Sequence, residues 1–146
     1  NLHRTESRGS AEGVARGAYI LAEASGGEPR AVLLASGSEV QIAVEARDAL
    51  EAEGVPTRVV SFPSWHLFGE QSADYQRQVL GGDSAIRVAV EAGSRLGWER
   101  WTGRRDAAIG LDRFGASAPA EVLYQKLGIT AEAVAGAVRQ GLADGA

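Results

Sequence analysis

The chain has 146 residues, 45% of them hydrophobic, with 19 acidic and 15 basic side chains and a net charge of -4, which together predict a single globular domain. The charges form no basic stripe, so we expect no nucleic acid partner. No apolar run approaches the roughly 20 residues of a membrane helix, and the first residues lack a signal-peptide core. We therefore expect a cytoplasmic protein without a membrane partner. Cysteine is absent, which excludes disulfides and thiolate sites. Methionine is absent too, which leads us to expect a segment of a longer protein.

Short apolar runs bounded by turn residues predict strands, at residues 18–21, 31–35, 57–61, 86–90 and 107–110. The segment between the first two runs is too short for a helix, which predicts an antiparallel hairpin. The later runs are spaced for helical crossovers and are predicted to be parallel. We therefore expect a three-layer α/β/α domain over residues 11–146, after a loose segment, 1–10. Its five-stranded mixed sheet is mostly parallel with one antiparallel edge strand.

A helix is predicted between the second and third strands. Helical periodicity gives it an apolar face formed by Ile42, Ala43, Ala46, Ala49 and Leu50 and a charged face formed by Glu45, Asp48 and Glu51. Val44 does not fit this pattern. The spacings Ser36 to Glu39 and Ser38 to Gln41 are both typical of a capping box, and Gly54 followed by Pro56 predicts the end of the helix.

The last helix is predicted to begin after Thr130, whose hydroxyl is a suitable N-cap. Its buried face is expected to contain Val134, Val138 and Leu142. Gly136 and Gly141 each weaken it by about 1 kcal/mol relative to alanine, so it depends on tertiary packing.

Residues 112–119 form a corner that resembles the nucleophile elbow G-x-S-x-G, except that Pro119 replaces the last glycine. A triad needs a histidine, and the sequence offers only His3 and His66. We therefore interpret Ser117 as the N-cap of a helix that ends before Gly128. No catalytic, cofactor-binding or metal-ligating residue is predicted.

The turn Ser36, Gly37, Ser38 and Glu39 joins a strand to a helix, where backbone N–H groups and the helix dipole favour an anion. The alternative is that these residues only cap the helix. Glycine spacings typical of a dinucleotide or P-loop site are absent. The turn is kept as a candidate anion-binding site.

A candidate docking surface is predicted from residues that follow the later strands. Glu91 ends the fourth strand at the edge where α/β sheets place ligands. Trp98 and Trp101 are expected to form a half-buried lid or part of an interface. The surface is completed by the corner and contains Glu91, Trp98, Asp112, Arg113, Phe114 and Ser117.

Taken in order, several segments resemble the C-terminal domain of transketolases. They are GAYIL, VLLASGSEVQIAVEARDAL, GVPTRVVSFPSWHLFGEQ, YQRQVL, RVAVEAG, GWERWTG and IGLDRFGASAPAEVLYQKLGIT. The resemblance covers residues 11–140. It implies a parent enzyme of the pentose phosphate pathway that uses thiamine diphosphate and Mg²⁺ to move a two-carbon ketol unit from a ketose phosphate to an aldose phosphate. Dihydroxyacetone synthase is a related alternative.

The resemblance also implies where the chemistry lies. In that family the first domain holds the cofactor diphosphate and metal through a Gly-Asp-Gly segment, of which this chain has only Gly82-Asp83-Ser84. The implied role is a non-catalytic domain whose partners are the N-terminal and middle domains of a homodimeric parent. Two alternatives remain: a regulatory anion- or nucleotide-binding module, and the docking subunit of a split transketolase-like enzyme.

Overall fold

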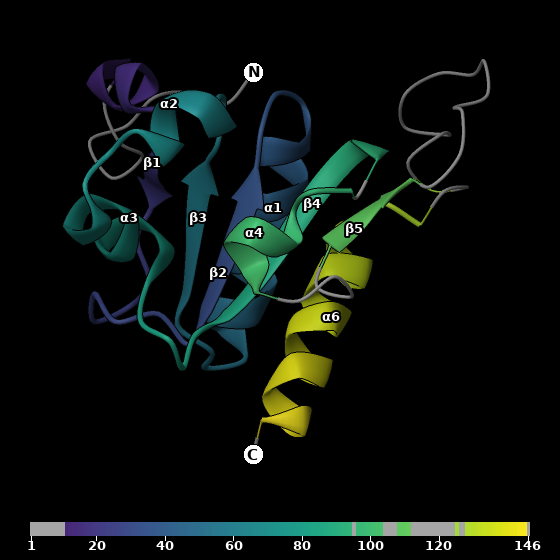
Figure 1. Ribbon diagram of the computed structural model, residues 1–146. Coiled ribbons are helices and arrows are strands. Elements are labelled where there is room, and N and C mark those ends of the chain that lie inside the picture. Colours follow the sequence, from purple (N-terminus) through teal and green to yellow (C-terminus); the bar gives the residue numbers. More distant parts are fainter. Residues whose placement is uncertain (1–10, 95, 104–107, 112–124, 126–127, 146) are drawn as a thin grey trace.

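The computed structural model describes residues 11–94, 96–103, 108–111, 125 and 128–145 (Figure 1). Its centre is a five-stranded sheet with the order β1-β3-β2-β4-β5. The strands are β1 (Tyr19–Ala22), β2 (Ala31–Ala35), β3 (Thr57–Ser61), β4 (Ile86–Ser94) and β5 (Ala108–Leu111). All neighbours are parallel except the edge strand β1, which is antiparallel to β3, so the predicted mixed sheet is confirmed.

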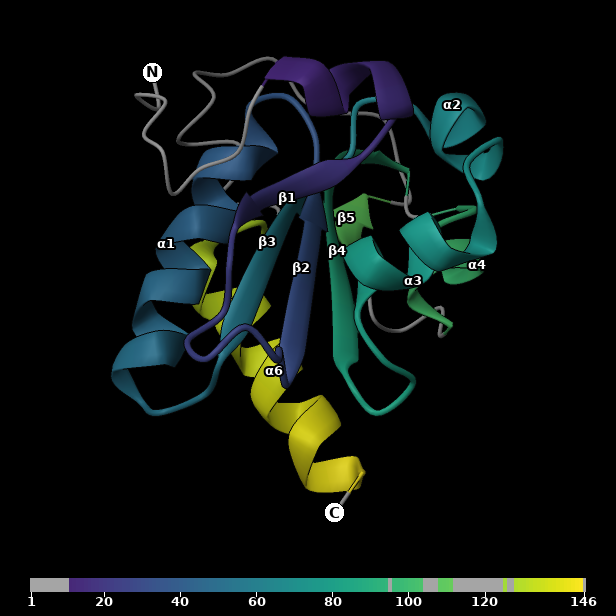
Figure 2. The ribbon, with the colours of Figure 1, turned by 90° about the vertical axis from the view of Figure 1, so that its left-hand side faces the viewer.

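Helices cover both faces of the sheet, as a three-layer fold requires. They are the 3₁₀-helix η2 (Ala11–Arg16), α1 (Glu39–Ala52), α2 (Trp65–Gly69), α3 (Ala73–Leu80), α4 (Glu99–Thr102) and α6 (Ala131–Asp144). Figure 2 views the sheet nearly edge on, with α1 and α6 on one side and α2, α3 and α4 on the other. None of the described helices is both long and apolar enough to cross a bilayer.

The predicted hairpin between the first two strands is wrong, because β1 pairs with β3 and not with β2. Tyr19 lies opposite Ser61, while Ala31 starts β2 opposite Thr57 on the other side of β3. The eight-residue connection 23–30 therefore passes beneath the amino end of β3. It has to cover the distance from β1 to β2, which is two strand spacings or about 10 Å, and eight residues easily span this distance. All residues of β2 are buried, because β2 is a central strand with parallel neighbours and both of its faces are covered.

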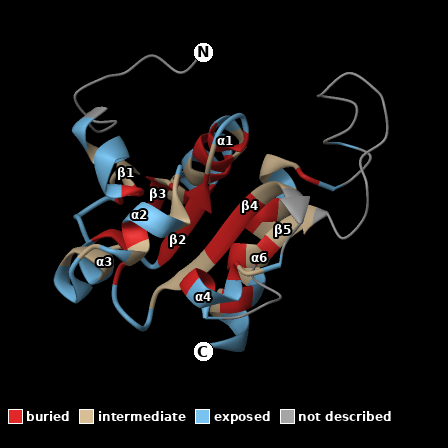
Figure 3. Cartoon of the chain, turned by 45° about the horizontal axis from the view of Figure 1, so that its top comes forward, coloured by how far each residue is buried: buried red, intermediate tan, exposed pale blue. Residues whose placement is uncertain are grey.

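Each face of the sheet has its own core (Figure 3). Alternate residues of β2 point to opposite faces: Leu33 lies in the core under α1 and α6, and Leu34 in the core under the short helices. The first core is aliphatic. The second contains Phe62, Phe68 and two tryptophans.

The buried face of α1 differs from the prediction. Val44 is 5% exposed and belongs to the core, whereas Ala49 is exposed. The reason is that α1 packs against α6 as well as against the sheet, which widens its buried arc. The predicted capping boxes are not formed either, because the N-cap Ser38 has helical backbone angles and makes no side-chain cap bond.

The last helix agrees with the prediction. The hydroxyl of Thr130 accepts a hydrogen bond from the N–H of Ala133 at 3.1 Å, and Val134 and Val138 are fully buried. Leu142 is half-buried and packs at the margin of the aliphatic core. The two glycines are tolerated because this helix is held by α1 and β4.

Candidate functional site

The predicted anion-binding turn lies at the carboxyl end of β2, where α1 begins. Its own acid occupies it: Glu39 is 7% exposed, and Ser38 Oγ donates to Glu39 Oε1 at 3.0 Å. The second carboxylate oxygen lies 3.7 Å from where a Cβ on Gly37 would be. A bound phosphate would therefore meet a like charge at the helix start. Anion binding at residues 36–39 stays a prediction, and this arrangement argues against it.

Among the described residues the one histidine is His66. His66 lies on the surface of α2 with its side chain 82% exposed, and its Nε2 lies 3.3 Å from Glu70 Oε1. No group of three metal-ligating side chains occurs within the part of the chain that the structure describes. The residues of the nucleophile-elbow corner, including Ser117, lie outside the described residues.

The segment Gly82-Asp83-Ser84 forms an exposed turn before β4, at the amino edge of the sheet. Behind it, Arg87 donates to the carbonyl oxygens of Leu80 and Gly81, each at 3.0 Å. Burial lowers the pKa of the Arg87 guanidinium, an effect that the charge of Asp83 partly opposes. Asp83 thus interacts electrostatically with a structural arginine.

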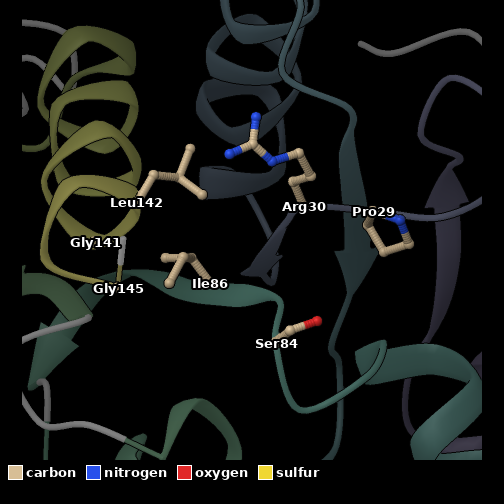
Figure 4. A pocket seen from close by; sticks show the side chains of 7 residues that line it. All are labelled: Pro29, Arg30, Ser84, Ile86, Gly141, Leu142 and Gly145. Carbon is tan, nitrogen blue, oxygen red and sulfur yellow. The ribbon is translucent and has the colours of Figure 1, made fainter.

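A pocket of about 260 Å³ lies at the same edge of the sheet (Figure 4). Leu142 and Ile86 line the side next to α6, and Pro29 and Arg30 come from the segment before β2. Its polar side chains, Arg30 and Ser84, are both exposed, so no buried polar group in its lining would orient a ligand. Ligands of α/β sheets bind at the opposite, carboxyl edge.

The tryptophans form the centre of an aromatic core instead of a half-buried lid. Trp98 and Trp101 are 1% and 3% exposed. Phe62 packs against both, with ring centroids 5.5 and 5.2 Å away, and Phe68 lies 5.3 Å from Trp101. Both indole N–H groups are buried without a hydrogen-bond partner among the described residues. Trp98 therefore adds no exposed area to the predicted docking surface.

Arg58 is a buried structural arginine that sequence reasoning missed. It is 5% exposed and contacts both carboxylate oxygens of Glu23, at 2.7 and 3.1 Å. It also donates to the carbonyl oxygens of Gln78, Val79 and Gly27. Arg58 thereby fixes the connection beneath β3 to the end of α3. Its strand position among apolar neighbours is the one signal that could have indicated burial.

The carboxyl edge on the aromatic side presents an apolar surface. The described large hydrophobic residues that are exposed are Val14 at 42%, Leu67 at 38% and Leu96 at 66%. Val14 lies in η2, Leu67 in α2, and Leu96 just after β4, so they come from three different segments at the carboxyl edge. Trp65, at the start of α2, is only half-buried, and its ring lies next to Gly97.

Two glycines hold these segments together. A Cβ on Gly17, whose φ is +85°, would lie 2.3 Å from the backbone nitrogen of Phe68, so η2 rests directly on α2. A Cβ on Gly97, with φ +92°, would lie 2.8 Å from the ring of Trp65. Side chains at either position would force the segments apart. The residues that follow η2 and the residues that follow β4 are therefore both held close to α2.

Of the residues predicted for docking, Glu91 is half-buried and lies within β4, which continues to Ser94, so Glu91 does not end the strand as predicted. Asp112, Arg113, Phe114 and Ser117 lie outside the described residues. Docking through these residues stays a prediction. The sequence reasoning missed Val14, Leu67 and Leu96, because a single exposed apolar residue has no distinctive pattern in a sequence.

A model of transketolase-like TK C-terminal domains matches residues 17–130. Transketolase 10 of Craterostigma plantagineum is 50% identical over 133 residues, covering 90% of this chain and 20% of the relative. The chloroplastic transketolase of Solanum tuberosum is 49% identical over 132 residues, covering 90% and 18%. The chain thus spans about a fifth of the length of these curated relatives.

Solved structures are similar as well. Transketolase from Leishmania mexicana has a TM-score of 0.85 and 42% identity, covering 94% of this chain and 20% of that one. A split gene transketolase, described as an inactive beta4 tetramer, has a TM-score of 0.65 and 24% identity and supports the fold alone. The structural similarity extends over the five-stranded sheet and both layers of helices.

Proposed function

Because the chain belongs to the family of transketolase-like C-terminal domains, we propose that residues 11–146 are the non-catalytic C-terminal domain of a larger transketolase. In this proposal the parent enzyme transfers a two-carbon ketol unit from a ketose phosphate to an aldose phosphate, as part of the pentose phosphate pathway. The proposal includes a homodimeric parent in the cytoplasm, which sedimentation of the full-length protein and cell fractionation would test.

One observation carries the proposal. The family match extends over most of this chain, yet the relatives are about five times as long. The remaining length of the parent has to supply its other domains, and we propose that the N-terminal and middle domains are the partners of this one. A domain that positions its neighbours can affect the reaction rate, because a shift of about 1 Å at the reacting groups lowers the rate about a hundredfold.

Thiamine diphosphate and Mg²⁺ are implied for the parent, but the described residues do not fit them. The helix start best placed for a diphosphate holds the carboxylate of Glu39 instead. Asp83, the acid in the partial Gly-Asp-Gly match, is exposed and faces the arginine charge of Arg87. We therefore assign no cofactor contact and no reaction step to these residues.

The test is a ketol-transfer assay with thiamine diphosphate and Mg²⁺ on three samples. These are the full-length parent, this chain alone, and the parent ending before residue 11. We expect turnover from the full-length parent, none from this chain, and a rate lowered about a hundredfold or more in the shortened parent. Turnover by this chain alone would contradict the non-catalytic assignment, and an inactive parent would contradict the proposed reaction.

The alternatives lead to different results. A regulatory module would release or absorb heat when phosphate or a nucleotide is titrated into this chain, and we expect none because Glu39 already occupies the turn. A docking subunit of a split enzyme would be encoded separately from its partner. Sequencing of the gene upstream of Asn1 decides this, since our proposal requires the preceding domains in the same reading frame.

A further inference from the structure

We propose that residues 19–29, which are β1 and most of the connection beneath β3, form a latch that opens and closes as one unit while the rest of the domain stays folded. The closed latch covers the outer edge of β3 (Figure 2), and the carboxylates of Glu23 and Glu51 hold it shut. An uncovered strand edge is a template for pairing with another chain, so the closed latch protects the sheet. This inference goes beyond the proposed function and does not depend on it.

Both ends of the latch are anchored to the body of the domain. Just before β1, Ala18 is fully buried, and its carbonyl oxygen accepts a hydrogen bond from the hydroxyl of Tyr75 at 2.8 Å. Just after the latch, the N–H of Arg30 donates to the carbonyl oxygen of Pro56 at 2.9 Å. Opening between two fixed points leaves the rest of the chain in place, so it can be a local event.

Between the anchors, the latch buries little apolar surface. Three of the four residues of β1 are half-buried, whereas all five residues of β2 are buried. The pairing of β1 with β3 is irregular between Ile20 and Ala22. Residues 25–28 are exposed, and a Cβ on Gly26 or Gly27 would meet no atom of the described residues within 4 Å. Segments with few buried apolar contacts open at a low cost in free energy.

Two carboxylates supply the polar contacts that close the latch. Glu23, within the latch, contacts the guanidinium of Arg58 in β3 at 2.7 and 3.1 Å. Glu51 of α1 accepts hydrogen bonds from the hydroxyl of Ser25 and from its N–H, the latter at 3.0 Å. The same carboxylate accepts from the N–H of Thr57 at 2.8 Å, so Glu51 joins the latch to the start of β3. Charge-assisted hydrogen bonds are stronger than neutral ones, and removing either charge should therefore favour the open form.

The arginines that hold the latch keep other acceptors when it opens. Arg58 loses Glu23, but it still donates to the carbonyl oxygens of Gln78 and Val79, at 2.8 and 3.2 Å. Arg47 loses one carbonyl group of the latch and keeps one carbonyl group of β3, at 3.1 Å. Neither guanidinium is left without an acceptor, which removes the main penalty that would otherwise couple opening to global unfolding.

The experiment is hydrogen exchange at pH 7 on the full-length protein that contains this chain, followed by peptide mass spectrometry. The variants are Glu23→Gln and Glu51→Gln, each of which removes one of the two charges. The matched control is Glu28→Gln, because Glu28 is an exposed residue of the latch and loses the same charge.

We expect peptides from β1 and from residues 23–29 to exchange about fivefold or more faster in both variants, and by the same factor. Peptides from β2 and α6 should change less than about twofold, as should all peptides of the control. Acceleration that includes β2 and α6 would overturn the proposal, because opening would then be global. Acceleration confined to residues 23–29, or a variant that behaves like Glu28→Gln, would overturn it as well.

The unsubstituted protein gives a second measurement, which remains informative if a variant fails to fold. Amides of β1 that pair with β3 should be protected at least about tenfold less than amides of β2, because the latch opens without the central strands. Equal protection of β1 and β2 would show that they open only together, and would overturn the latch.

Discussion

The two faces of the sheet are covered in different ways. On one face, α1 and α6 have 14 residues each and pack small and aliphatic side chains against the strands. On the other, α2, α3 and α4 have only 5, 8 and 4 residues. Helices this short are not stable by themselves. The second face depends instead on aromatic rings, and Arg58 and Arg87 bind main-chain carbonyl groups at the end of α3.

Two glycines of α6 and two arginines of the strands illustrate this difference. Long regular helices tolerate Gly136 and Gly141 because their packing is distributed over several turns. The short helices leave carbonyl groups at their ends without helical partners, and Arg58 and Arg87 supply the donors at the end of α3. The aromatic face should therefore be more sensitive to single substitutions.

The largest expected effect is the loss of an aromatic ring from the second face. Phe68 is fully buried and contacts Phe62, Tyr75 and Trp101, so Phe68→Ala should lower the free energy of unfolding by about 3–5 kcal/mol. Chemical denaturation measures this. Leu67→Ala, one residue away and exposed, is the control and should change stability by less than about 1 kcal/mol.

The same measurement on the aliphatic face sharpens the comparison. Leu50 of α1 is also fully buried, and Leu50→Ala is expected to lower stability by about 2–5 kcal/mol. If it proves more damaging than Phe68→Ala, the aromatic rings are not what holds the second face together.

The next effect concerns the arginines. Arg58→Ala removes donors from three carbonyl groups and from Glu23, and should lower the free energy of unfolding by about 2–4 kcal/mol. Arg139 is the matched control on the other face, where it joins Glu53 and Glu132 at the surface. Arg139→Ala should have a much smaller effect. Similar losses in urea denaturation would show that burial of Arg58 is unimportant.

Sequence reasoning predicted the strands and the long helices because their signals are local. The apolar runs at 31–35 and 57–61 coincide with β2 and β3, and Thr130 caps α6 as expected. The pairing of β1 was mispredicted, because the choice between β2 and β3 as partner depends on contacts far apart in the sequence. Val44 was missed for the same reason, since its burial requires the distant helix α6.

The candidate site was less predictable than the fold. Exposed Leu67 and Leu96 become informative only when the fold brings them to one edge with Trp65. Trp98 was predicted to be half-buried, as part of a lid or of an interface. Its burial against Phe62 is a tertiary contact between segments more than thirty residues apart, which no local pattern reveals.

A gain of stability is expected on the aliphatic face. A Cβ at Gly136, inside α6, would meet no atom within 4 Å, so Gly136→Ala should raise the free energy of unfolding by about 0.5–1 kcal/mol. Gly128→Ala is the control, because it also has open space but a φ of +74°. It should be destabilising. Thermal denaturation of both variants separates backbone preference from packing.

The smallest effect is a pH dependence at the connection beneath β3. Burial alone would raise the pKa of Glu51, but hydrogen bonds donated by Ser25 and by the N–H of Thr57 outweigh it and leave the pKa lowered from its usual value of 4.5. A carboxyl group whose pKa is lower when folded contributes stability above its unfolded pKa and loses it as the pH falls through the folded value. Glu51→Gln should therefore reduce the slope of unfolding free energy against pH below about 4.5 while leaving the slope near pH 7 unchanged. Glu45→Gln is the control, because Glu45 is exposed on the same helix. Equal slopes of unfolding free energy against pH in the two variants would show that the contacts of Glu51 to Ser25 and Thr57 do not favour its charged form.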